Sequence, residues 1–359
     1  MKNYLIKLLN YIVDNKCSDL HLITNSKPYA RKSGVINMIM EEEIITPEIM
    51  DGFIKEILGD FTIKIKELEE KKQVDISYSI GEQRFRVNIF TQMNKKGIVI
   101  RVINNKIPSL YDLGLPEIVE KTAHFTSGLV LITGPTGSGK STTLAAIIDL
   151  INSSKKKHIL TVEDPIEYTH KNKMSIINQR EVGQDVNSFN DAIKGALRED
   201  PDIMLVGEMR DLETISNAIT MAETGHLVFG TLHTISAPQT INRIIDVFDA
   251  NAQQQIKVQL ASALQAVICQ KLITGIDGNY KCATEVMLVN DAIRGIIRDG
   301  RNISSISDNI STNRRSLGTQ TMDQSLASLV NTKQISLKSA QEISNDKETL
   351  LRYIQAGVV

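Results

Sequence analysis

The residues best suited to chemistry lie in one glycine-rich stretch. Residues 134–141 read GPTGSGKS and match the eight-residue phosphate-binding loop pattern without a mismatch. Glycines let the backbone curl until its N–H groups point at a β-phosphate, and a following helix adds the positive end of its dipole. The ammonium of Lys140 is expected to reach the β- and γ-phosphates, and the hydroxyl of Ser141 to ligate a bridging Mg²⁺. The stretch predicts a nucleotide site formed by Gly134, Pro135, Thr136, Gly137, Ser138, Gly139, Lys140, Ser141 and Thr142.

A phosphate-binding loop lies between a strand and a helix, and both flanks are present here. Residues 129–133 (LVLIT) form an apolar run typical of a buried strand, and residues 142–152 have the pattern of a helix. A plain surface loop of glycine and serine would need neither flank. The surroundings therefore favour nucleotide binding.

Two carboxylates directly follow predicted strands. Glu163 follows residues 158–162, and Glu208 follows residues 203–207. Because the carboxyl ends of parallel strands share one edge of a sheet, both side chains should point toward the phosphate loop. Hydrolysis of a β–γ phosphate bond needs one group that activates water and others that hold Mg²⁺. We expect Glu163 to activate water and Glu208 to bind Mg²⁺ or the water. The reverse assignment stays open, as does a simple capping of strand ends.

Two histidines and two arginines are further catalytic candidates. His226 and His233 flank the apolar run 227–230. Near a phosphate loop each could sense the γ-phosphate, although an isolated histidine is more often structural. Arg198 and Arg210 lie beside the acidic segments. Each either stabilises charge on a γ-phosphate or forms an ordinary salt bridge with a neighbouring acid.

Composition narrows the class of protein. The 41 basic and 42 acidic residues nearly cancel and only 4% of residues are aromatic, which argues against nucleic-acid binding. Cys17, Cys269 and Cys282 are far apart, which argues against a zinc site or a disulfide framework and favours a reducing compartment. No apolar run reaches the length of a membrane span. We therefore expect a cytoplasmic protein without a membrane span.

The 359 residues are enough for two or three domains. Residues 1–104 predict a small mixed domain, and the polar, proline-marked residues 105–116 predict a linker. From 117 to 275, apolar strand-like runs alternate with helical patterns, which predicts a mostly parallel sheet covered by helices. Residues 276–359 are expected to be helical.

Smaller elements are also expected from periodicity. The N-terminal domain should contain strands and helices at residues 5–13, 19–23, 35–39, 47–58, 74–90 and 97–103. Apolar residues spaced by three and four over 256–272 predict a helix, and stripes at 292–297 and 322–330 predict two more. The Ser-, Asn- and Thr-rich residues 302–321 are expected to form a mobile, exposed loop.

One side of the predicted hairpin at residues 74–90 is basic. Strict alternation places Arg84 and Arg86 on the same side, opposite the apolar side chains, and Arg101 in the following strand is expected to join them. A solvated polar face is the alternative interpretation.

Several blocks of sequence, in order, resemble the ATPases of the type II/IV secretion family. They are the phosphate loop, an acidic box at 161–167 (TVEDPIE), a segment at 205–211 (LVGEMRD) and a histidine box at 222–234. The start at 17–22 (CSDLHL) and the stretch 292–298 (AIRGIIR) resemble, more narrowly, the PilT-type retraction ATPases of type IV pili. Gly295 and Asp299 depart from the usual family form, in which asparagine and glutamate are common.

The resemblance implies an α/β architecture with a PAS-like N-terminal domain, a RecA-like ATPase core and a helical C-terminal part. It also implies a homohexameric ring that binds ATP and Mg²⁺ between neighbouring subunits. In such a ring Arg84, Arg86 and Arg101 would reach nucleotide at the interface.

The activity implied by the resemblance is ATP hydrolysis coupled to pilus retraction and twitching motility. The implied location is the cytoplasmic face of the inner or plasma membrane, on a pilus platform protein. The chain has no paired cysteines after the histidine box, which favours retraction over assembly or secretion. Three alternatives stay open: a pilus assembly or type II secretion ATPase, a RecA-like nucleic-acid translocase, and a nucleotide switch with little turnover.

Overall fold

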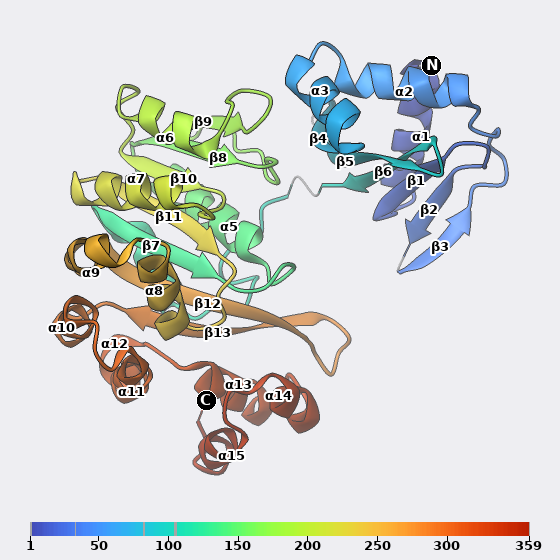
Figure 1. Ribbon diagram of the computed structural model, residues 1–359. Helices are drawn as coiled ribbons and strands as arrows, with labels where there is room; N and C mark the ends of the chain where they lie inside the picture. Colours follow the sequence, from blue (N-terminus) through green and yellow to red (C-terminus); the bar gives the residue numbers. More distant parts are fainter. Residues whose placement is uncertain (1, 33, 82, 104–105, 359) are drawn as a thin grey trace. The chain divides into compact units, whose positions relative to one another are not determined.

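The computed structural model describes residues 2–32, 34–81, 83–103 and 106–358 (Figure 1). Its internal contacts divide the chain into two compact units. The N-terminal unit comprises Met1–Lys106, Asp164–Thr169 and Arg180–Asn187, and the P-loop unit comprises the remainder. The expected boundary at 104–105 lies outside the described residues. Sequence patterns did not indicate that two short segments beyond residue 160 pack with the N-terminal unit.

The N-terminal unit is an antiparallel sheet with helices packed on one face. Its six strands have the order β3-β2-β1-β6-β5-β4. The core is formed by apolar residues of α1, such as Leu5 and Leu8, together with Phe53 and the inward residues of the strands. The elements are α1 (Lys2–Asp14), β1 (Asp19–Ile23), β2 (Tyr29–Lys32), β3 (Val35–Met38), α2 (Pro47–Leu58), α3 (Thr62–Lys71), β4 (Gln73–Ile80), β5 (Gln83–Gln92) and β6 (Lys95–Val102).

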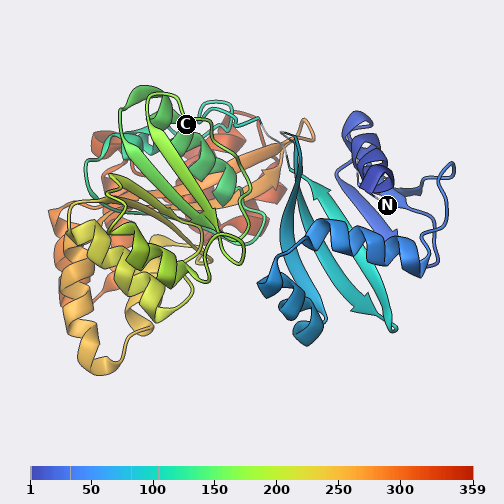
Figure 2. The ribbon, with the colours of Figure 1, turned by 90° about the horizontal axis from the view of Figure 1, so that it is seen from above.

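The P-loop unit contains a seven-stranded sheet with helices on both faces. The strand order is β13-β12-β7-β11-β10-β8-β9, with parallel pairing from β12 through β8 and an antiparallel β12–β13 pair. Figure 2 shows the sheet between α5 on one side and α7 to α9 on the other. The elements are α4 (Ile118–Lys121), η1 (Thr122–His124), β7 (Gly128–Thr133), α5 (Lys140–Ser154), β8 (His158–Glu163), β9 (Ile176–Glu181), α6 (Phe189–Ala196), β10 (Ile203–Val206), α7 (Leu212–Glu223), β11 (Leu227–Leu232), α8 (Ala237–Asp246), α9 (Ala250–Ala263), β12 (Leu264–Thr274) and β13 (Tyr280–Leu288).

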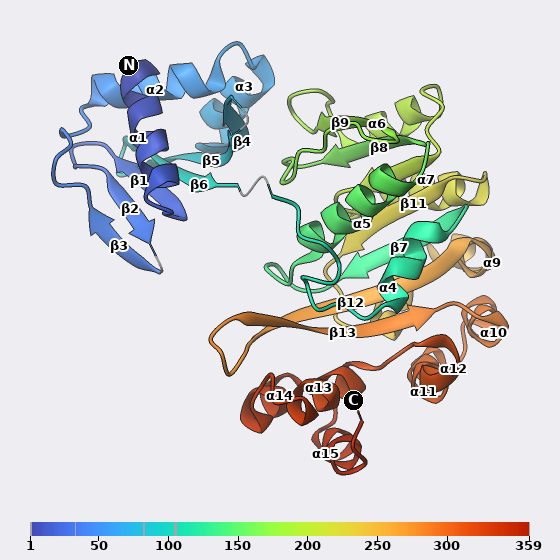
Figure 3. The same ribbon diagram turned by 180° about the vertical axis from the view of Figure 1, so that it is seen from behind.

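The last part of the P-loop unit is helical and packs beside β13 (Figure 3). Apolar residues of α13 to α15, including Met322, Leu326 and Leu350, form a small core with Ile273 and Ala283 of the β12–β13 pair. The elements are α10 (Asp291–Asp299), η2 (Ile303–Ser305), α11 (Ile306–Thr312), α12 (Arg314–Leu317), α13 (Met322–Asn331), α14 (Leu337–Ile343) and α15 (Lys347–Gln355). None of the helices in the described part of the chain is long and apolar enough to cross a membrane.

Two element predictions in the C-terminal half are wrong. The helix predicted over 256–272 ends at Ala263, and β12 begins at the next residue, Leu264. β13 extends the sheet into the region expected to be helical from 276. The reason is that β12 lies between β7 and β13 and is buried on both faces. A strand of this kind is apolar throughout, so its periodicity does not distinguish it from a buried helix.

The predicted mobile loop at 302–321 is also wrong. This segment forms η2, α11 and α12. Ile303, Ile306 and Ile310 recur at helical spacing and are buried, which anchors the segment despite its polar composition. The apolar spacing was present in the sequence but was outweighed by the many Ser and Asn residues.

Candidate active site

The phosphate loop connects β7 to α5 and has the shape of an anion cradle. Gly134 has a φ of 145°, and a Cβ there would lie 2.4 Å from the carbonyl oxygen of Gln270 and 2.6 Å from Ser138 Oγ. Only glycine fits this position. Lys140 Nζ donates to the carbonyl oxygens of Gly134 at 2.8 Å and Pro135 at 3.1 Å. These two hydrogen bonds hold the side chain of Lys140 against the phosphate loop.

The loop residues fit a bound phosphate. Ser138 is 2% exposed, and its hydroxyl has no hydrogen-bond partner within the described chain. A buried polar group without a partner is costly, and a phosphate oxygen would satisfy it. The N-terminus of the 15-residue helix α5 adds its dipole at the same place.

A magnesium ion would be held through the nucleotide rather than by the protein alone. Within the described residues no group of three His, Cys, Asp or Glu side chains could form a metal cage. Mg²⁺ commonly takes one or two protein ligands together with phosphate oxygens. The hydroxyl of Ser141 and the carboxylate of Glu208 have oxygen donors of the kind that Mg²⁺ prefers, and their role as its ligands stays a prediction.

Close pairing of β8 and β10 brings the two acidic strand ends together. Val162 and Val206 are in register, and the N–H of Gly207 donates to the carbonyl oxygen of Val162 at 2.7 Å. A Cβ on Gly207 would lie 3.1 Å from the Cα of Glu163. The glycine therefore allows the chain carrying Glu208 to pass directly beside Glu163.

Glu208 is held by two basic side chains. Its Oε1 lies 2.8 Å from Nε2 of His233 and accepts a hydrogen bond from Nε of Arg210. The hydroxyl of Thr231 donates to the carbonyl oxygen of Gly207 at 2.5 Å and fixes the backbone beneath it. Both hydrogen bonds fix the direction in which the Glu208 carboxylate points.

Glu163 accepts hydrogen bonds from two neutral side chains. Its Oε1 accepts a hydrogen bond from the hydroxyl of Thr161 at 2.8 Å and from Nε2 of Gln179 at 3.4 Å. The side chain is half-buried at the end of β8. That Glu163 rather than Glu208 activates water stays a prediction.

Comparison with known proteins assigns the family. Residues 1–358 match the family described as type II/IV secretion system protein. The chain belongs to this family. It is 45% identical to the type IV pilus retractation ATPase PilT of Pseudomonas aeruginosa over 337 residues, covering 94% of this chain and 96% of the relative. It is 44% identical to the twitching motility protein of Neisseria gonorrhoeae, covering 90% and 86% of the two chains.

A solved structure supports the same relationship. The crystal structure of the pilus retraction motor PilT with bound ADP matches with a TM-score of 0.88 and 43% identity, covering 96% of this chain and 98% of that one. The expected fold class of this family member is therefore confirmed, with its P-loop ATPase core, smaller N-terminal domain and helical C-terminal part. The sequence-based recognition of the family is confirmed as well.

The structure separates two predicted catalytic residues of this family member from the phosphate loop of the same chain. His226 precedes the amino end of β11, where its Nδ1 lies 3.0 Å from the carbonyl oxygen of Met221. Arg198 lies in the loop that leads to the amino end of β10. The phosphate loop follows the carboxyl end of β7, which is parallel to β11. His226 and Arg198 therefore lie near the strand ends opposite the phosphate loop of their own chain, and their catalytic roles stay predictions.

The three arginines on β5 and β6 of this family member differ in their ion pairs and in the exposure of their side chains. Arg84 forms an ion pair with the buried Glu181 at 3.1 Å and its side chain is 19% exposed. Arg86 and Arg101 lie directly opposite each other on β5 and β6, with side chains 42% and 67% exposed. The latter two are therefore the more accessible arginines.

Asp19 is a partner of these arginines that sequence reasoning missed. Its Oδ1 accepts a hydrogen bond from Nε of Arg101 at 2.8 Å, and Arg31 lies 3.7 Å from its Oδ2. Burial raises the pKa of Asp19, but hydrogen bonds from Arg101 and Ser18 and the charge of Arg101 outweigh this and leave the pKa below its usual value. The one signal in the sequence was an acidic residue beginning a strand in the CSDLHL segment.

Gln270 is a second missed residue, in the P-loop unit. It is buried in β12, and its Nε2 donates to the hydroxyl of Thr143 in the first turns of α5 at 2.8 Å. This contact anchors the helix that carries Lys140 and Ser141. A glutamine within the apolar run 264–274 was the available signal.

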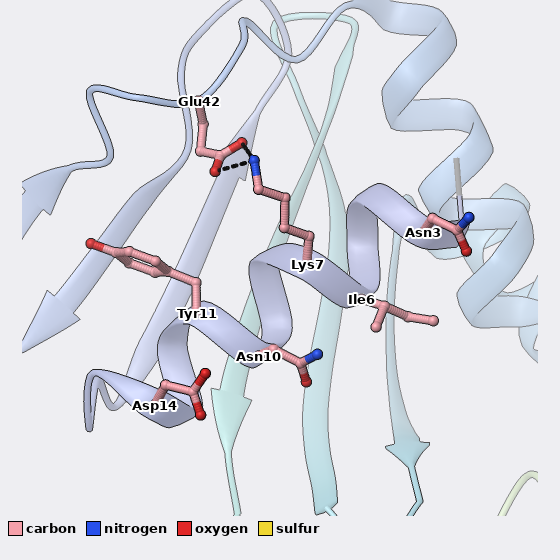
Figure 4. Close-up of a pocket in the computed structure, with 7 residues that line it drawn as sticks. All are labelled: Asn3, Ile6, Lys7, Asn10, Tyr11, Asp14 and Glu42. Carbon is pink, nitrogen blue, oxygen red and sulfur yellow. Dashed lines mark hydrogen bonds and ion pairs between the residues drawn. The ribbon is translucent and has the colours of Figure 1, made fainter.

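A hollow along α1 in the N-terminal unit contains none of the residues predicted to bind or hydrolyse nucleotide (Figure 4). Two of its charged side chains form an ion pair, with Lys7 Nζ 2.8 Å from Glu42 Oε1. The other side chains that line it are Asn3, Ile6, Asn10, Tyr11 and Asp14. The hollow is in a different unit from the phosphate loop, and we assign no chemistry to it.

Proposed function

We propose that this protein is an ATP-hydrolysing motor that drives retraction of a type IV pilus. The observation that carries the proposal is the 45% identity with the pilus retraction ATPase PilT over nearly the full length of both chains. The phosphate loop and the acidic strand ends beside it provide the groups that ATP hydrolysis requires.

The geometry of the site supports a proposed role for each group of residues. The phosphate loop binds the β- and γ-phosphates, with Lys140 offsetting their charge. Mg²⁺, when bound, neutralises charge that develops on the transferred phosphoryl group. Ser141 and Glu208 would hold the ion, and His233 and Arg210 orient Glu208. Glu163 accepts the proton of the attacking water.

The motor is proposed to be a homohexameric ring with ATP between neighbours. Arg86 and Arg101 reach the nucleotide of a neighbouring subunit, because they are the accessible cations of the hairpin. Arg84 instead secures the hairpin through Glu181.

Mixed rings test this arrangement. An Arg86→Ala/Arg101→Ala chain and a Lys140→Ala chain, each inactive alone, should regain partial ATPase activity after co-assembly, because some interfaces then pair an intact loop with intact arginines. Ring formation is checked first by native mass. A double arginine variant that hydrolyses ATP at the wild-type rate would reject the proposed role.

The proposed place of work is the cytoplasmic face of the inner or plasma membrane, on the platform protein of the pilus. Pilus retraction is measured in cells that lack this protein and then regain it, with Lys140→Ala as the matched inactive control. The wild-type gene should restore retraction and twitching, and the variant should not. Normal retraction without the protein, together with a defect in pilus assembly or secretion, would favour another member of the family.

A further inference from the structure

Gln179 of β9 has its side-chain amide oriented by a backbone group. Its Oε1 accepts a hydrogen bond from the N–H of His170 at 2.7 Å. A backbone N–H can only donate, so the oxygen of the amide must face His170. The Nε2 group consequently faces the opposite way, where it donates to Oε1 of Glu163 at 3.4 Å.

The backbone that orients Gln179 is itself held by the end of the P-loop helix. Asn152 near the C-terminus of α5 is fully buried. Its Nδ2 donates to the carbonyl oxygen of Lys171 at 2.8 Å, and its Oδ1 accepts from the N–H of Lys173 at 3.1 Å. The helix that begins at the phosphate loop therefore ends on the segment that fixes Gln179.

Thr161 is the second donor to Glu163. It is fully buried in β8, and its hydroxyl donates to the same oxygen of Glu163 at 2.8 Å. Two neutral donors from two strands thus converge on a single carboxylate oxygen. Such donors restrict rotation of the carboxylate and hold its oxygen in one direction.

We propose that Gln179 and Thr161 are positioning residues for Glu163, and that Asn152 links their arrangement to the P-loop helix. The inference rests on the proposed function, in which Glu163 accepts a proton from the attacking water. A general base works only when its oxygen is aligned with the water, and small misplacements cost much of the rate. Gln179 touches neither ATP nor water in this scheme and acts through Glu163.

The decisive variant is Gln179→Glu in the full-length protein with ATP and Mg²⁺. It keeps the oxygen that accepts from His170 but places a second carboxylate beside Glu163. We expect kcat to fall by about ten- to a hundredfold, as for a misaligned catalytic group. The KM for ATP and the affinity for ADP should stay unchanged, because the phosphate loop is intact.

The pH profile separates positioning from a merely structural role. A second carboxylate disfavours ionised Glu163, so the acid limb of the kcat profile should move to higher pH. Asn178→Asp is the matched control, since Asn178 is the preceding residue of β9 and contacts His158 rather than Glu163. That control should keep the wild-type kcat and profile.

Thr161 provides a second test that does not depend on Gln179→Glu folding. Thr161→Val is nearly isosteric and removes only the donor, so kcat should fall by about tenfold. Thr161→Ser retains the hydroxyl and should recover most of the lost rate. A melting temperature for each variant confirms that the fold persists.

The kcat of Glu163→Gln, measured together with the other variants, distinguishes failure of the positioning role from failure of the proposed function. If Glu163→Gln is nearly inactive while Gln179→Glu and Thr161→Val keep the wild-type kcat and pH profile, the positioning role is overturned and the proposed function stands. If Glu163→Gln itself turns over at the wild-type rate, Glu163 is not the base, and both proposals fall.

Discussion

The two ends of the seven-stranded sheet carry the same kinds of side chain in different surroundings. At the carboxyl end, His233 and Arg210 contact Glu208 beside the strand end that carries Glu163. At the amino end, His226 contacts the main chain of Met221. The six residues of β11 separate the two histidines by about 20 Å. Two residues that are close in sequence can therefore belong to different sites when a strand lies between them.

The largest effect is expected at the carboxyl end from Lys140→Ala. Loss of the charge over the phosphates should lower turnover by about 10³-fold or more. The melting temperature should change little, since the ammonium contacts the loop rather than a core. Lys156→Ala, at an exposed lysine after α5, is the control and should behave as wild type. An active Lys140→Ala protein would contradict the assignment of the phosphate loop.

The next effect distinguishes the two carboxylates at that end. Glu163→Gln should bind ATP and Mg²⁺ normally but lower kcat by about 10²- to 10⁴-fold, because an amide cannot accept the proton. Glu208→Gln should instead raise the Mg²⁺ concentration required for activity. Titrations with ATP and Mg²⁺ and steady-state rates measure both. The opposite pattern in the two variants would exchange their roles.

Variants of the two histidines allow a direct comparison of the carboxyl and amino ends of the sheet. His233→Ala should lower kcat by about tenfold or more, since it removes a hydrogen bond to the Glu208 carboxylate. His226→Ala should leave kcat unchanged and lower only the melting temperature. Rates and melting curves of the two variants provide the measurement. A larger loss of kcat in His226→Ala would mean that the amino end takes part in catalysis.

The smallest effect concerns stability rather than rate. Burial lowers the pKa of His170 from 6.5 to about 4, with the nearby Asp149 partly opposing the shift. The unfolded chain therefore takes up a proton on this side chain at higher pH than the folded protein does. Stability from this group is fully present above pH 6.5 and is lost as the pH falls toward about 4, by about 3 kcal/mol.

His170→Phe removes this titration. Urea unfolding at several pH values should show a shallower loss of stability between pH 6.5 and 4 in the variant than in the wild type. Parallel slopes in the two proteins would show that His170 is not responsible.

Elements with strong local signals could be predicted from the sequence. The helix at 47–58 has its observed bounds because Pro47 suits the first helical position and the hydroxyl of Thr46 accepts from the N–H of Ile49. β12 could not be predicted, because its apolar run reflects burial between two other strands. Gln179 gave no signal at all, since a polar residue in a short strand is ordinary until its neighbours are known.

The sequence by itself determined the phosphate loop, since the glycines, the lysine and the serine that shape and equip it are contiguous and their conformation is local. It also placed Glu163 and Glu208 at strand ends. Only the tertiary structure decided which groups surround each carboxylate. Thr161 and Arg210 are two residues from the carboxylates that they contact, but His233 and Gln179 come from other segments of the chain. The approach of these distant partners depends on strand order, register and the space left by Gly207. Those are properties of packing between distant segments, which no local pattern of residues encodes.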